Sequence, residues 1–217
     1  MKGFIFDLDG VIVDTARYHY LAWKKTGEEL GFELSIEQNE KLKGVSRVDS
    51  LNKILGWAGV EISEEKFNRL MDEKNEDYLN YVEQMTPADI LPGVKDFILE
   101  LKAKGLPIAL GSASKNAPRI LEKIGMLEYF DAIADGNSVK KAKPDPEVFL
   151  VAAKSIVTAP EACVVFEDAE AGVEAANNAG MISIGIGSPD NLSHADHVFS
   201  DFTLITTDFI LNLQPKH

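Results

Sequence analysis

The sequence predicts an α/β protein in which a parallel sheet is interrupted, near its N-terminus, by an all-helical segment. Two observations support this prediction. Short apolar runs alternate with helical patterns over most of the chain, whereas the region from about residue 15 to residue 82 contains only helical patterns. With 217 residues, 45% of them hydrophobic, the chain can form one large domain, or one domain that carries a smaller insert.

Four apolar runs are typical of buried strands, because each is short and is bounded by turn or polar residues. They are GFIF, PIALG, CVVF and ISIGI, at residues 3–6, 107–111, 163–166 and 182–186. Helical patterns accompany the later runs at residues 93–104, 117–124, 146–156 and 169–179. This alternation predicts a Rossmann-like core domain with a parallel sheet.

The insert has four successive helical patterns, at residues 18–30, 36–43, 47–55 and 64–82. Its borders fall just after Asp14 and near the segment TPAD, where proline and short polar residues suit a hinge. We therefore expect a catalytic core domain formed by residues 1–14 and 83–217, and a helical cap domain formed by residues 15–82.

The charge and the lack of targeting signals restrict the classes of partner. A formal net charge of −13 disfavours nucleic acid and anionic membranes as partners, and it means that an anionic substrate needs a local cationic site. No apolar run approaches the ~18 residues of a membrane span, and no signal peptide is recognisable. The single cysteine, Cys163, lies among apolar residues and is expected in the core. We expect a cytoplasmic monomer that binds small molecules.

Polar side chains follow several of the predicted strands. Asp7 and Asp9 come directly after the first strand, Ser112 follows the second, and Glu167 and Asp168 follow CVVF. The carboxyl ends of parallel strands meet at one edge of the sheet, where ligands bind. A loop lysine, Lys143, precedes Pro144 and is expected at the same edge.

Crowded carboxylates repel each other unless a cation lies between them, and a hard divalent ion with oxygen ligands meets this need. Mg²⁺ is the natural candidate. It would also neutralise a phosphate group, while a lysine and a serine hydroxyl could hold the remaining phosphate oxygens. One of the two aspartates of the first motif could then act as a nucleophile, and the other as a general acid or base.

Four segments, FDLDGVIVDT, GSASKN, KAKPDP and FEDAEAG, together resemble the signature motifs of the haloacid dehalogenase-like phosphotransferases. In the insert, YHYLAWK, LKGVSRVDSL and EKNEDY are similar to the helical cap of the sugar-phosphate mutases in that family. The resemblance covers nearly the whole chain and weakens in about the last twenty residues.

The resemblance implies a set of catalytic and metal-binding residues. Asp7 would be the phosphoryl-accepting nucleophile and Asp9 the general acid or base, while Ser112 and Lys143 would hold the transferring phosphoryl group. The ligands of Mg²⁺ would come from Asp7, Asp9 through its backbone carbonyl, Glu167 and Asp168, with Glu167 either a direct ligand or a neighbour of the ligands.

The resemblance also implies a substrate site that includes cap residues. Arg47 would bind the distal phosphate of a sugar bisphosphate. The other residues implied at this site are Thr15, His19, Trp23, Lys43, Gly44, Val45, Ser46, Ser50, Lys74, Ala113, Ser114 and Asn116.

The implied reaction is the interconversion of β-glucose 1-phosphate and glucose 6-phosphate, through phosphorylated Asp7 and a 1,6-bisphosphate. Two alternatives stay open. A Mg²⁺-dependent sugar-phosphate phosphatase of the same family would use the same core, with water as the final acceptor. A non-catalytic sugar-phosphate-binding protein would be expected to lack Asp7 or Asp9, and this sequence has both.

Overall fold

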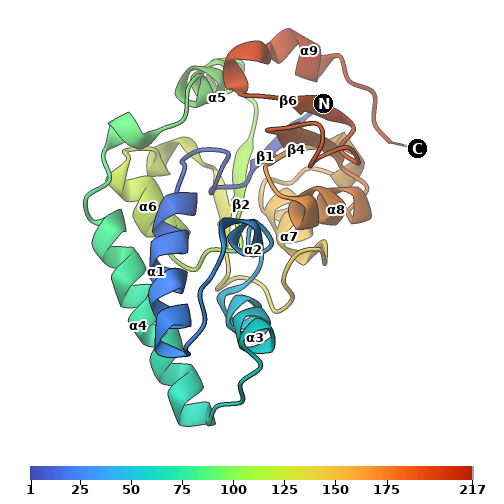
Figure 1. Ribbon diagram of the computed structural model, residues 1–217. Coiled ribbons are helices and arrows are strands. Elements are labelled where there is room, and N and C mark those ends of the chain that lie inside the picture. Colours follow the sequence, from blue (N-terminus) through green and yellow to red (C-terminus); the bar gives the residue numbers. More distant parts are fainter. Residues whose placement is uncertain (217) are drawn as a thin grey trace.

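A parallel sheet of six strands forms the centre of the protein, in a computed structural model that describes residues 1–216 (Figure 1). All neighbouring strands pair in parallel, in the order β3-β2-β1-β4-β5-β6. The strands are β1 (Gly3–Phe6), β2 (Ile108–Gly111), β3 (Ala132–Ala134), β4 (Cys163–Glu167), β5 (Ile182–Ile186) and β6 (His197–Phe199). The predicted α/β class is confirmed, although β3 and β6 were not predicted.

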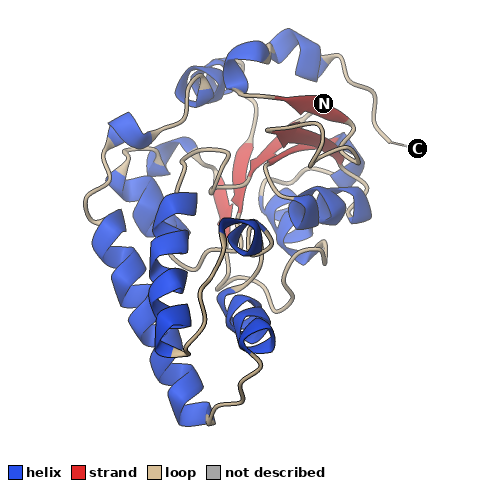
Figure 2. Cartoon of the chain, viewed as in Figure 1, coloured by secondary structure: helices blue, strands red, loops and turns tan. Residues whose placement is uncertain are grey.

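Nine α-helices surround or extend from this sheet within residues 1–216 (Figure 2). The first four are α1 (Ala16–Glu29), α2 (Ile36–Glu40), α3 (Arg47–Ala58) and α4 (Glu64–Val82). The others are α5 (Val94–Ala103), α6 (Ala117–Lys123), α7 (Glu147–Ser155), α8 (Glu170–Asn178) and α9 (Thr207–Leu211). No helix among these residues is both long and apolar enough to span a membrane.

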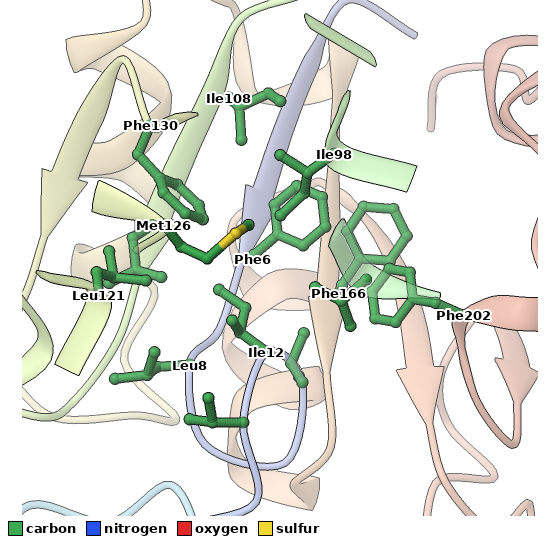
Figure 3. Packing of buried hydrophobic residues seen from close by; sticks show 14 of the residues in the cluster. Phe6, Leu8, Ile12, Ile98, Ile108, Leu121, Met126, Phe130, Phe166 and Phe202 are labelled. Carbon is green, nitrogen blue, oxygen red and sulfur yellow. The ribbon is translucent and has the colours of Figure 1, made fainter. Parts of the chain in front are cut away.

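The two faces of β1 pack against different helices, because successive side chains of a strand point to opposite faces. Phe4 and Phe6 belong to a core that includes side chains of α5, α6 and α9, whereas Ile5 belongs to a second core with side chains of α7 and α8. Figure 3 shows the first core, where the ring of Phe6 stacks on that of Phe166 with a centroid distance of 4.6 Å. This double coverage fixes β1 in the middle of the molecule.

Helices α1–α4, called the cap below, extend from one end of the sheet (Figure 1). They enclose a third core of their own, which contains Trp23, Leu51 and Leu70. The chain segments that lead into and out of this group lie side by side, since the Leu91 amide donates to the Ile12 carbonyl at 2.9 Å. The exact domain borders, at residues 14/15 and 82/83, stay a prediction.

The strand order has a switch point next to β1. From β1 the chain continues to β2 and β3 on one side of the sheet, and β4, β5 and β6 lie on the other side. A crevice forms at the carboxyl ends of the strands at such a point, and ligands bind there in open α/β sheets. The fold therefore directs the ends of β1, β2 and β4 toward a potential binding site.

Val157 offers a test of backbone strain. Among the non-glycine residues from 1 to 216, it alone has a left-handed backbone, with φ of 54°, and it is 93% exposed. A β-branched residue is disfavoured in this conformation by about 1–2 kcal/mol, whereas asparagine tolerates it. We expect Val157→Asn to raise the free energy of unfolding by about 1 kcal/mol, measured by urea denaturation at an unchanged m-value.

Val48→Asn is the matched control for Val157→Asn. Val48 is also exposed but lies in the regular helix α3, where valine and asparagine have similar propensities. This variant should leave stability almost unchanged. Equal effects of the two substitutions would contradict the assignment of strain to Val157.

Candidate active site

One cavity of about 440 Å³ lies between the carboxyl ends of β1, β2 and β4 and the cap helices. A volume of this size is typical of small-molecule sites. The cavity brings together all but one of the residues predicted for the site. Those that line it are Asp7, Asp9, Thr15, His19, Trp23, Lys43, Gly44, Val45, Ser46, Arg47, Ser50, Lys74, Ser112, Ala113, Ser114, Asn116, Lys143 and Asp168. Glu167 lies behind the wall and is fully buried.

The Lys143 ammonium joins the carboxylates of two strands. Its Nζ donates to Asp7 Oδ1 at 2.6 Å and to Glu167 Oε1 at 2.8 Å, and its side chain is 1% exposed. Lys143 comes from the loop between β3 and α7, and its Nζ lies 4.7 Å from the ring centroid of Phe149. A buried cation with two carboxylate partners is held in one position, beside the carboxylate that the sequence predicts as nucleophile.

The pKa values of Asp7 and Lys143 are both raised, but for different reasons. Burial raises the pKa of Asp7 to about 8, because desolvation of the carboxylate outweighs the attraction of Lys143. Burial disfavours the charged form of Lys143, but the attraction of Asp7 and Glu167 outweighs this and raises its pKa. Lys143 therefore stays charged, and Asp7 ionises more readily if further positive charge comes close.

Asp7, Glu167 and Asp168 form an acidic cluster that fits a divalent cation. One oxygen from each carboxylate lies within 4.8 Å of the other two. Burial raises the pKa of Asp168 well above its ordinary value, with further contributions from the negative charges of Glu167 and Asp7. Carboxyl groups crowded in this way ionise together more readily when a cation lies between them, and oxygen ligands of this kind suit hard cations. The cluster could thus hold a metal ion.

Two glycines allow these carboxylates to approach the backbone. Gly10 has φ of 75°, and a Cβ there would lie 2.0 Å from Asp168 Oδ2. A Cβ on Gly172 would lie 1.6 Å from Glu167 Oε1. The second oxygen of Glu167 accepts the backbone N–H groups of Asp168 and Ala169 at 2.7 and 3.1 Å. The position of Glu167 is therefore fixed from both sides.

Asp9 lies at the cavity edge next to two cap residues. The Thr15 hydroxyl donates to Asp9 Oδ1, and His19 Nε2 lies 4.0 Å from the same oxygen. Partial burial raises the pKa of Asp9, although the bond from Thr15 acts in the opposite direction. A carboxyl group with a raised pKa can carry a proton to or from a substrate oxygen near neutral pH.

Lys74 is the buried cation of the cap. It is 3% exposed, and its Nζ lies 2.9 Å from His19 Nδ1 and 4.8 Å from the ring centroids of both Trp23 and Tyr78. Burial and the positive charge of Arg47 lower the pKa of Lys74 to about 7. An ammonium has no acceptor, so a charged Lys74 must donate to a neutral His19. The Nε2–H of that imidazole then faces Asp9.

The loop after β2 supplies hydroxyl and amide groups to the cavity. Ser112 is buried, and its Oγ accepts the backbone N–H of Ser114 at 3.1 Å. Ser114 Oγ accepts the backbone N–H of Asn116 at 3.2 Å. These bonds shape a tight turn before α6, and Asn116 Nδ2 at the end of this turn donates to Asn75 Oδ1 of α4 at 2.9 Å.

The first turn of α3 places Arg47 at the cavity. Ser46 caps this helix, since its Oγ accepts the backbone N–H of Asp49 at 3.2 Å. Arg47 Nη2 donates to Asn75 Oδ1 at 2.7 Å. Nearby, Lys43 Nζ lies 3.9 Å from Asp168 Oδ2. Cationic side chains of the cap thus lie across the cavity from the acidic end of the sheet.

Sequence reasoning missed three residues of α4 that line the cavity: Met71, Asn75 and Tyr78. They share one helix face with Lys74, because positions 71, 74, 75 and 78 repeat at helical spacing. This helical spacing from the predicted site residue Lys74 could have indicated that the other three line the same cavity. The Tyr78 hydroxyl is buried, and in the described residues it has no hydrogen-bond partner.

The fold and the site together define a phosphotransferase-like α/β protein, and the sequence comparison agrees. Residues 1–180 match the haloacid dehalogenase-like hydrolase family. This chain belongs to that family.

Two similar sequences and one similar crystal structure come from sugar-phosphate enzymes. The chain is 43% identical over 209 residues to β-phosphoglucomutase of Bacillus subtilis, which covers 94% of this chain and 92% of the relative. It is 30% identical over 184 residues to a phosphorylated carbohydrates phosphatase of Thermotoga maritima, with coverages of 83% and 82%. A crystal structure of β-phosphoglucomutase from Clostridium difficile superposes with a TM-score of 0.94 at 42% identity, over 97% of this chain and 95% of that one.

The contribution of Lys143 to the stability of the buried carboxylates Asp7 and Glu167 can be measured. Lys143→Met removes the charge and leaves Asp7 and Glu167 buried without their partner. In metal-free buffer we expect the free energy of unfolding to fall by about 3–5 kcal/mol, measured by urea denaturation. A divalent cation should restore part of this loss, because it can replace the missing positive charge.

Lys141→Met is the matched control, in the same loop. Lys141 is exposed and pairs with Asp145 at the surface, so its loss should change stability by less than about 0.5 kcal/mol. Similar losses for the two variants would show that Lys143 does not stabilise the carboxylates as described.

Proposed function

We propose that the protein is a β-phosphoglucomutase, an isomerase that interconverts β-glucose 1-phosphate and glucose 6-phosphate by phosphoryl transfer. The observation that carries this proposal is that one cavity joins the acidic end of the sheet to the cationic residues Arg47 and Lys74 of the cap. A sugar bisphosphate needs two anion sites, one on each wall. The likeness to β-phosphoglucomutases of Bacillus subtilis and Clostridium difficile supports the same function.

The core residues have complementary roles in this proposal. Asp7 attacks the phosphorus, so a bond to its carboxylate oxygen forms while the bond between phosphorus and the sugar oxygen breaks. Asp9 gives a proton to that sugar oxygen, and in the reverse direction takes the proton from the attacking hydroxyl. Lys143 and Ser112 stabilise the negative charge on the transferring phosphoryl oxygens. The 2.6 Å contact between Lys143 and Asp7 places this cation beside the nucleophile.

We propose Mg²⁺ as the cofactor, held by Asp7, Asp168 and the backbone carbonyl of Asp9, with Glu167 beside them. The acidic cluster and its oxygen donors support this choice. When bound, the ion would neutralise the carboxylates and the phosphoryl group, so that an anionic nucleophile can approach an anionic phosphate.

The cap residues would orient the sugar and exclude water. Arg47 would hold the distal phosphate, while His19, Trp23 and Lys74 would contact the sugar or fix the residues that do. The remaining predicted contacts are Thr15, Lys43, Gly44, Val45, Ser46, Ser50, Ala113, Ser114 and Asn116, all of which line the cavity. A closed cap would protect phosphorylated Asp7 from hydrolysis, and an open cap would let the bisphosphate reorient.

The proposal includes the organisation of the protein. Residues 1–14 and 83–217 form the catalytic core, and residues 15–82 form the cap that moves against it. The protein would act as a monomer, because one chain supplies every residue of the proposed site. We also propose a cytoplasmic location. The net charge of −13 disfavours nucleic acid as a partner.

The direct test supplies Mg²⁺, β-glucose 1-phosphate and a trace of the 1,6-bisphosphate, and measures glucose 6-phosphate and free phosphate together. We expect glucose 6-phosphate to form in large excess over phosphate. Exhaustive chelation of the metal should stop turnover. The Asp7→Asn variant should form no glucose 6-phosphate even with Mg²⁺. Release of phosphate as the main product would favour the phosphatase alternative.

Arg47→Ala tests the cap. A guanidinium can hold a phosphate through two parallel hydrogen bonds, and in a closed site their loss costs about 2 to 4 kcal/mol of transition-state stabilisation. We expect kcat/KM for β-glucose 1-phosphate to fall roughly thirty- to thousand-fold. Phosphorylation of Asp7 by acetyl phosphate, which has no distal phosphate, should be nearly unchanged.

Arg17→Ala on α1 is the control for Arg47→Ala. Arg17 is exposed and lies outside the cavity lining, so this variant should behave like the wild type with both substrates. Equal losses for both substrates in Arg47→Ala would indicate a damaged fold. No loss for either would mean that Arg47 does not bind the distal phosphate.

A further inference from the structure

Asn75, in the middle of α4, contacts residues from both sides of the cavity. Its Oδ1 accepts a hydrogen bond from Arg47 Nη2 at 2.7 Å and another from Asn116 Nδ2 at 2.9 Å. Arg47 is the first residue of α3, and Asn116 directly precedes α6 in the core. We infer that Asn75 is a positioning residue, whose side-chain oxygen holds Arg47 and Asn116 side by side so that both donate to one distal phosphate. The inference rests on the proposed function.

The chemistry of the three side chains fixes their orientation. A guanidinium has only donors, so Asn75 must present its oxygen, and not its amide nitrogen, to Arg47. Asn116 must then present its own amide nitrogen to the same oxygen. The remaining N–H groups of Arg47 and the second amide hydrogen of Asn116 are left for another acceptor, and the two donor groups lie next to each other.

The bond between Asn75 and Asn116 also joins the cap to the core. Within residues 1–216 it is the only hydrogen bond between a side chain of α1–α4 and a side chain of the segment 83–216. Lys43 and Asp168 also face each other across the cavity, but at the longer distance of 3.9 Å. Loss of the Asn75 side chain should therefore weaken closure of the cap as well as the placement of Arg47.

A neutral acceptor suits this position. Charged oxygens of a phosphate accept stronger hydrogen bonds than an amide oxygen does, so an incoming phosphate can recruit the donors that Asn75 holds in place. A carboxylate at position 75 would hold Arg47 more tightly, but it would also repel the phosphate. An alanine would hold neither donor.

The experiment compares Asn75→Ala with Asn80→Ala, which lies on the exposed side of the same helix and outside the cavity lining. For β-glucose 1-phosphate with Mg²⁺ and bisphosphate, we expect Asn75→Ala to raise KM about tenfold with little change in kcat. It should also raise the ratio of free phosphate to glucose 6-phosphate, because the cap closes less well. Asn80→Ala should match the wild type. An unchanged KM and product ratio in Asn75→Ala would overturn the inference.

Two further variants separate positioning from packing. In an Arg47→Ala background, Asn75→Ala should have little further effect on KM, since the residue it positions is gone. The same tenfold effect in that background would contradict a role through Arg47.

Asn75→Asp should keep the product ratio of the wild type but raise KM more than Asn75→Ala does. A product ratio like that of Asn75→Ala would show that the acceptor oxygen is not what closes the cap.

Small-angle scattering of the free protein provides a readout that does not depend on the reaction. Asn75→Ala should have a larger radius of gyration than the wild type and Asn80→Ala, and an identical radius would overturn the role in closure. Failure of the proposed function is recognised separately, because the wild type itself would then form no glucose 6-phosphate.

Discussion

The site depends on the Lys143 ammonium, which lies between the carboxylates of Asp7 and Glu167. Asp7 directly follows β1 and Glu167 is the last residue of the neighbouring strand β4. Because both carboxylates are buried, without the lysine they would repel each other and take up protons. A third carboxylate, Asp168, lies beside these two, so one lysine is shared among three acidic side chains. This cluster of oxygen donors would suit a divalent cation, which in the proposed function would in turn attract an anionic phosphoryl group.

The wall of the cavity that the cap forms presents cationic side chains to the core. Arg47 and Lys74 lie on α3 and α4, and the mutual repulsion of these two cations contributes to the lowered pKa of Lys74. The core side of the cavity therefore presents carboxyl groups, and the cap side presents the basic side chains of Arg47 and Lys74. A ligand with two phosphates, together with a metal ion on the core side, would compensate both walls at once. A ligand with one phosphate would leave the cations of the cap without an anionic partner. This difference links closure of the cap to the ligand that the proposed mutase reaction requires.

Much of the fold could be predicted from the sequence, because its long elements have strong patterns. The four apolar runs became β1, β2, β4 and β5, and the helical insert became α1–α4, with α4 over the predicted residues 64–82. Strands β3 and β6 were missed since each has only three residues, and partly exposed side chains give them no continuous apolar run. Their place in the sheet depends on pairing with β2 and β5, which is a long-range property that a local pattern does not contain.

The site was predictable to the extent that its chemistry is local. Asp7 and Asp9 after the first strand indicate a charged site from sequence alone, and the motif resemblance adds residues such as Arg47 from distant segments. Asn75 could not be predicted in the same way, because an asparagine on a polar helix surface looks like any solvent-exposed residue. Its importance comes only from contacts with residues 28 and 41 positions away. A side chain of this kind acts through the partners it positions, so it is recognised only when three separate elements have been placed around one oxygen atom.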